Sequence, residues 1–157
     1  MSKFDELMKM AEQFAIYNFN KESGVQPMWL AETEDGEMMC IATPFESPES
    51  KNAAFNALRV MFKVQKVVRF AFMSEAWCVK VDKDEKRPEG SLEFAPNRLE
   101  VLVLNGADVS GEMAYIHHII ERKGESVTLG ERTDHRGEEI AGNLADMLPR
   151  QEPLTRH

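Results

Sequence analysis

The sequence feature that most constrains the fold is the segment from Val67 to Val81. It is rich in β-branched and aromatic residues and contains neither glycine nor proline. Successive side chains of a strand point to opposite faces of a sheet, and here both alternating sets are largely apolar. A strand that is apolar on both sides is typical of the middle of a sheet. We therefore predict that this segment is the longest strand and lies centrally.

Shorter apolar segments separated by turn-forming residues predict five further strands. The first two flank Asp35-Gly36, a pair that favours the positive dihedral angles of a tight hairpin turn. The last three are separated by Asn105-Gly106, Gly111 and Lys123-Gly124, and we expect them to continue the sheet as an antiparallel meander. These five strands are predicted at residues 29–33, 38–43, 98–104, 113–122 and 126–131.

Two segments show the three-and-four spacing of apolar residues that is typical of amphipathic helices. Residues 3–20 follow Ser2, which is suited to cap the free amides of a helix. Residues 48–65 follow Ser47 and begin with proline, a residue favoured at the first helical position. Residues 140–148 predict a short third helix.

This order of elements predicts the α+β class, with a mostly antiparallel sheet of about six strands and two main helices packed on one face. The expected order is α-β-β-α-β-β-β-β, followed by the short C-terminal helix. A chain of 157 residues has the usual length of one domain. We expect residues 1–148 to form that domain and residues 149–157 to form a short tail.

The composition disfavours several classes of function. The 19 basic and 27 acidic side chains give a net charge of −8, which repels phosphate backbones and anionic lipid, so we expect no nucleic-acid partner. No apolar run approaches the roughly 18 residues of a membrane span. The N-terminus mixes charged with apolar residues, and Cys40 and Cys78 lack the spacing of a disulfide framework. We expect a cytoplasmic protein that does not enter membranes.

Glu75 is the strongest candidate for a functional side chain. Strand alternation places it between Met73 and Trp77, and an apolar setting raises the pKa of a carboxyl group toward the range useful for acid or base catalysis. A structural role is the alternative. Glu75 then faces solvent or pairs with Arg69 or Arg98 on the same or a neighbouring strand.

His117 and His118 are adjacent on a predicted strand, so their side chains point to opposite faces and do not chelate one metal ion. No Asp or Cys stands at a spacing that completes a metal site, and we expect neither a metal nor another cofactor. Each histidine is most simply a half-buried sheet residue. A cross-strand acid-base pair between one of them and Glu75 remains open.

No complete catalytic motif is present, so the sequence favours a noncatalytic binding or assembly domain that acts through protein-protein contacts, including self-association. Trp29 and Trp77 are candidate contact residues, with core packing as the alternative. The second hypothesis is a small-molecule enzyme. It uses Glu75 as acid or base, His117 or His118 as its partner, and Arg98 to hold an anion.

Overall fold

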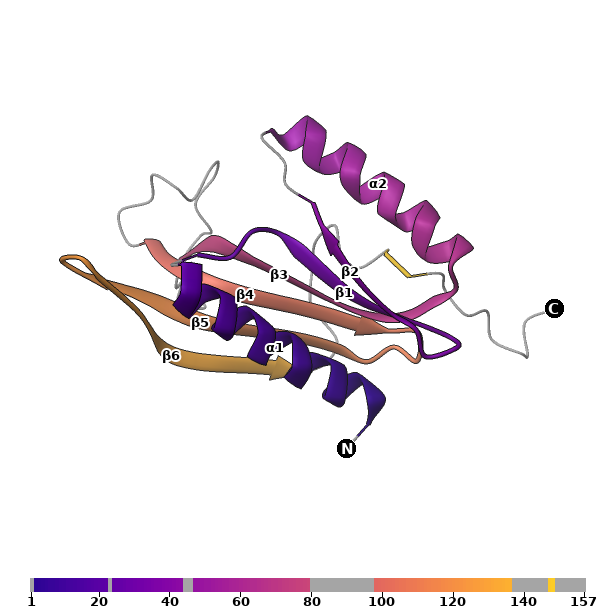
Figure 1. Ribbon diagram of the computed structural model, residues 1–157, viewed down its shortest axis with the longest axis horizontal. Helices are drawn as coiled ribbons and strands as arrows, with labels where there is room; N and C mark the ends of the chain where they lie inside the picture. The colour runs from indigo at the N-terminus through magenta and orange to yellow at the C-terminus, as the bar shows by residue number, and fades with distance from the viewer. Residues whose placement is uncertain (1, 23, 44–46, 80–97, 137–146, 149–157) are drawn as a thin grey trace, which may run out of the picture.

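The computed structural model describes residues 2–22, 24–43, 47–79, 98–136 and 147–148 (Figure 1). Within these residues the chain forms two helices and six strands. They are α1 (Lys3–Glu22), β1 (Met28–Thr33), β2 (Met38–Ala42), α2 (Pro48–Val64), β3 (Val67–Val79), β4 (Arg98–Asp108), β5 (Met113–Lys123) and β6 (Ser126–Arg136). The α+β class and the order of these elements are confirmed. Most of the predicted third helix lies outside the described residues, and Met147 and Leu148 are not helical.

The described strands form one antiparallel sheet in the order β2-β1-β3-β4-β5-β6. β3 is the longest of them and lies between β1 and β4, as its apolar character predicts. It pairs with β4 along eleven registered positions, from Arg69 opposite Asp108 to Val79 opposite Arg98. This long ladder sets which side chains of β3 and β4 lie side by side.

The ends of the first elements follow the local sequence signals. Ser2 caps α1, since its Oγ accepts a hydrogen bond from the Asp5 N–H at 3.1 Å. Ser47 caps α2 through a reciprocal pair of hydrogen bonds with Ser50, and a proline occupies the first turn. Gly36 has a φ of 87° in the hairpin between β1 and β2. These predicted boundaries are confirmed.

The two helices cover opposite faces of the sheet (Figure 1), so the expectation that they share one face is wrong. Along β3, Ala71 and Met73 pack in the same cluster as α1, whereas Phe70 and Phe72 pack in the cluster that contains α2. Both alternating sets of β3 side chains are apolar. Burying both sets requires a helix on each face of the sheet, which is why the helices do not share one face.

Trp29 is the centre of the core on the α2 side. Its side chain is wholly buried, and its indole Nε1 donates a hydrogen bond to Oγ1 of Thr43 at 2.9 Å. The indole ring lies within 6 Å, centroid to centroid, of four phenylalanine rings: those of Phe55, Phe62, Phe70 and Phe72. Trp29 therefore holds α2 against β1 and β3.

Asn105 and Gly106, predicted to form a turn, lie inside β4. A Cβ atom at Gly106 would overlap Sδ of Met8 and would stand 3.1 Å from Cε1 of Phe4. Glycine is needed at this position because α1 lies close against β4, and not because the chain turns. The turn between β4 and β5 uses Gly111, which has a φ of 100°.

Candidate functional site

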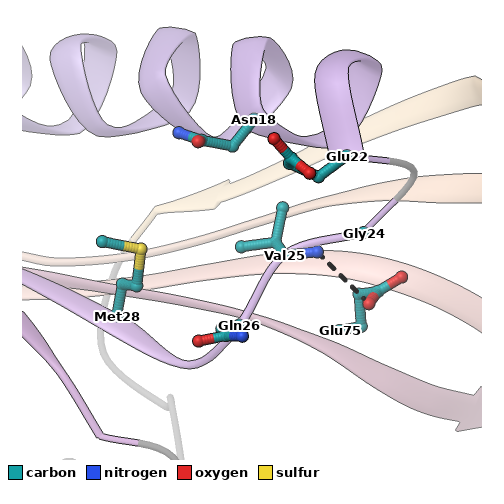
Figure 2. Close-up of a pocket in the computed structure, with 7 residues that line it drawn as sticks. All are labelled: Asn18, Glu22, Gly24, Val25, Gln26, Met28 and Glu75. Atoms are coloured by element: carbon teal, nitrogen blue, oxygen red, sulfur yellow. Dashed lines mark hydrogen bonds between the residues drawn. The ribbon is translucent and has the colours of Figure 1, made fainter.

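A pocket of about 520 Å³ opens where the last turn of α1 meets the start of β1 and the α1-facing side of β3 (Figure 2). Asn18 and Glu22 are four residues apart and therefore lie one above the other on the helix. Glu75 reaches the pocket from β3. The residues that line the pocket are Asn18, Glu22, Gly24, Val25, Gln26, Met28 and Glu75.

The Glu75 carboxylate is partly buried beside the segment that joins α1 to β1. Its Oε2 accepts a hydrogen bond from the Val25 backbone N–H at 3.3 Å, and Figure 2 shows its other oxygen turned away from Val25. Burial is the main cause that raises the pKa of Glu75, and the nearby charge of Glu100 adds to it. The hydrogen bond from Val25 and the charge of Arg122 oppose this shift without cancelling it.

Two polar pairs lie on the same sheet face beyond Glu75. Trp77 and Glu100 are register partners on β3 and β4. The Arg98 guanidinium stacks over the Trp77 ring at 4.5 Å from its centroid. Arg122 of β5 binds the Glu100 carboxylate through two hydrogen bonds of 2.7 and 2.8 Å. A strip of charged and aromatic side chains therefore lies on this sheet face beside the pocket.

The carboxylates of this region differ in their charge partners. The hydrogen bonds from Arg122 lower the pKa of Glu100, so Glu100 remains ionised. Neither Glu75 nor Glu22 forms an ion pair with a side chain in the described part of the protein. Arg98, one of the two pairing partners considered for Glu75, lies over Trp77 instead.

The other considered partner, Arg69, is occupied elsewhere. It forms ion pairs with Glu32 and Asp108, and its Nε is 2.8 Å from Oδ2 of Asp108. These contacts tie β1, β3 and β4 together toward the far end of the ladder from Glu75. Arg69 therefore stabilises the sheet and does not belong to the pocket.

His118 shares a sheet face with Glu75 but does not reach it. Glu75 is opposite Leu102, and Leu102 is opposite His118. The two residues are thus two strands apart, which corresponds to about 10 Å between their backbones. His118 Nε2 instead lies 2.6 Å from Oε2 of Glu12, a carboxylate that also binds Arg132.

His117 points to the opposite face of the sheet, where its ring lies near those of Tyr115 and His135. The acid-base pair considered for Glu75 is therefore not assembled with either histidine. Acid-base catalysis at Glu75 would need a partner group other than these two histidines.

The six residues selected from the sequence thus separate in space. Glu75, Trp77 and Arg98 lie on one face beside the pocket, and 38% of the Trp77 surface is exposed. Trp29 is a core residue on the other face and offers no surface to a partner. It was selected because the sequence alone does not distinguish a buried tryptophan from an exposed one.

Several residues in the pocket and beside it carry no distinctive sequence signal. Asn18 and Glu22 are ordinary polar residues of an amphipathic helix, and only the packing of α1 against the sheet brings them to Glu75. Glu100 and Arg122 meet because of the register of β4 and β5, which the sequence does not reveal. The cross-strand neighbours of Glu75 are set by the strand order, which a single segment of sequence does not encode.

The pocket combines groups suited to a positively charged ligand. Glu22 and Glu75 supply carboxylates, and the C-terminal end of α1 contributes the partial negative charge of its free carbonyl groups. Val25 and Met28 supply apolar surface for a hydrocarbon stem. An ammonium or guanidinium group on an alkyl chain matches this arrangement.

Comparisons with family models, curated proteins and solved structures found no match. Among the described residues, no three His, Cys, Asp or Glu side chains are grouped so that they could hold a metal ion. None of the helices in that part of the chain has the length and apolar character needed to cross a membrane. The case for a function therefore depends on the geometry of the pocket.

Proposed function

We propose that this protein is a noncatalytic binding domain whose pocket beside Glu75 receives a lysine or arginine side chain of a protein partner. The observation that carries this proposal is that two carboxylates, the exposed Glu22 and the partly buried Glu75, line one pocket of about 520 Å³. Neither carboxylate forms an ion pair within the described residues, so both are available to a cationic ligand. The methylene groups of the incoming side chain pack against Val25 and Met28.

The outer face of α1 supports a protein as the source of this cation. Met10, Phe14 and Tyr17 follow one another at intervals of four and three residues and are 48%, 39% and 64% exposed. Phe14 and Tyr17 of this apolar ridge lie in the C-terminal half of α1, as Asn18 and Glu22 do. A partner that packs apolar side chains on the ridge can place a basic residue in the pocket.

A small-molecule enzyme is the second candidate, because Glu75 has a raised pKa and lies in a pocket. It ranks below the binding domain since His118 is held by Glu12 and His117 lies on the opposite face. In that case Glu75 exchanges a proton with a substrate and does not hold a permanent cation.

The proposal is tested by titrating the protein with single-residue probes while recording amide resonances by NMR. N-acetyl-lysine amide and N-acetyl-arginine amide supply the cation, and N-acetyl-norleucine amide supplies the same kind of stem without charge. We expect saturable shifts at the backbone amides of Gly24, Val25 and Gln26 with the charged probes only. Binding in the millimolar range is expected for one side chain without its partner.

The Glu75→Gln variant keeps the volume and the hydrogen-bond acceptor of the side chain but removes its charge, so it should abolish these shifts. Glu34→Gln, at the exposed turn between β1 and β2, is the matched control and should leave them intact. Equal responses to the norleucine probe, or none at the three amides with any probe, would contradict a cation site.

A further inference from the structure

The outward face of α2 carries an apolar ridge formed by Ala53, Ala57, Val60 and Val64. Intervals of four, three and four residues place these side chains on one side of the helix, away from its buried residues Phe55, Leu58 and Phe62. All four ridge residues are exposed, and the exposed fractions are 64% for Val60 and 70% for Val64. No described residue covers two valines that an amphipathic helix would ordinarily bury.

The part of the ridge from Ala53 to Val60 is complementary in size to a reversed copy of itself. The N-terminal half of the ridge carries alanines and its C-terminal half carries valines. When two such helices pack antiparallel about a two-fold axis near Ala57, Ala53 lies opposite the partner's Val60. Ala57 then meets the partner's Ala57 at the axis, where small side chains let the helices approach closely.

The charges beside the ridge are also complementary only in this orientation. Glu49, Asn56 and Lys63 recur at seven-residue intervals and therefore follow one flank of the ridge, and all three are exposed. In an antiparallel pair, Glu49 faces the partner's Lys63, and Lys63 faces the partner's Glu49. In a parallel pair these flanks would lie on opposite sides of the interface, and Glu49 and Lys63 would face the uncharged flank that carries Ser50, Ala54 and Met61.

We propose that α2 is a homodimerisation surface on which a second copy of this chain packs its own α2 in the antiparallel direction. A helix of 17 residues is about 25 Å long, so a contact through α2 alone lies at the small end of specific interfaces. The dimer should therefore depend on protein concentration. Since α1 and α2 cover opposite faces of the sheet, dimerisation leaves the Glu75 pocket accessible, and this proposal does not depend on the cation site.

The experiment is sedimentation velocity of the full chain over a wide concentration range, combined with charge reversal. Glu49→Lys places two lysines together at each end of the antiparallel pair, and Lys63→Glu places two glutamates there. Each single variant should weaken the dimer about tenfold or more, because each contact occurs twice. A mixture of the two single variants should dimerise again. One variant then has two lysines on this flank and the other has two glutamates, so every contact between them joins opposite charges.

Glu34→Lys makes the same change of charge as Glu49→Lys but lies in the turn between β1 and β2, so it should leave the dimer unchanged. Both altered residues of α2 are exposed, and circular dichroism checks that the variants remain folded. The proposal is overturned if the wild-type chain stays monomeric at every concentration. It is equally overturned if the chain dimerises but neither charge reversal weakens the dimer.

Discussion

The backbone N–H of Val25 donates a hydrogen bond to Oε2 of Glu75, which lies 50 positions later in the chain. This contact joins the segment after α1 to the central strand β3 at the edge of the pocket. It holds a carboxylate in a partly buried position where the pKa of Glu75 is raised. The properties of the pocket therefore depend on a carboxyl group whose pKa burial raises above its ordinary value.

The Glu75→Gln substitution should change how stability depends on pH. Because the pKa of Glu75 is raised on folding, the folded protein holds this proton more tightly than the unfolded chain does. The wild-type free energy of unfolding should therefore fall as pH rises from the ordinary glutamate pKa toward the raised value, and the variant should lack this fall. Urea denaturation at a series of pH values measures the difference. A parallel pH dependence in wild type and variant would show that Glu75 is not desolvated.

Glu12 should have the opposite effect. Burial alone would raise the pKa of Glu12, but its interactions with Arg132 and His118 outweigh burial and lower the pKa. Its contribution to stability is therefore present above the unfolded-state pKa and is lost as pH falls through the folded-state pKa. Glu12→Gln should lower the free energy of unfolding by about 1–2 kcal/mol at neutral pH.

This destabilisation should shrink in acid, where the wild-type carboxylate is protonated as well. Glu6→Gln, at an exposed position six residues earlier on α1, is the control and should have little effect at either pH. A Glu12→Gln destabilisation that persists undiminished in acid would point to lost packing and not to the ion pairs.

The sequence predicted elements well where local chemistry decides the structure. Ser2, Ser47 and Gly36 marked the helix starts and the hairpin because caps and turns depend on a few neighbouring residues. It also contained a sign of the two-sided architecture, since Phe70 and Ala71 are both apolar and adjacent on β3. The prediction that both helices pack on one face of the sheet did not take this pattern into account.

The candidate site was only partly predictable for a physical reason. Glu75 could be selected from the sequence because its apolar neighbours on the same strand predict burial, and these neighbours lie within a few residues of it. Its partners in the pocket, Asn18 and Glu22, come from a helix more than 50 residues earlier. Their proximity depends on strand order and helix packing, which no short segment encodes.

Gly106 should tolerate a side chain poorly. A Cβ atom there would overlap Met8 and stand 3.0 Å from the Phe70 carbonyl oxygen. Gly106→Ala should lower the free energy of unfolding by about 1–3 kcal/mol through overpacking. Shortening Met8 to alanine removes the overlapping sulfur, so Gly106→Ala should cost less in that background. A double-mutant cycle measures this coupling, and strictly additive effects would contradict the close approach.

Trp29 should behave as a core residue and not as a contact for a partner. Thr43→Val removes the acceptor of the indole N–H while keeping the side-chain volume, and should cost about 1–3 kcal/mol because a buried donor is left unsatisfied. Trp29→Ala should cost about 3–5 kcal/mol. Chemical denaturation measures both. A Trp29→Ala protein with wild-type stability would contradict the burial described here.

The central claim, that the pocket holds a cation against Glu75, is tested most directly by the pKa of Glu75 itself. That pKa is measured by NMR from the Glu75 carboxyl carbon, first in the free protein and then with saturating N-acetyl-lysine amide. A cation that binds the ionised carboxylate must lower its pKa by linkage, so the raised value should fall when the probe is added. An unchanged pKa at a probe concentration that saturates the Val25 amide shift would contradict the account.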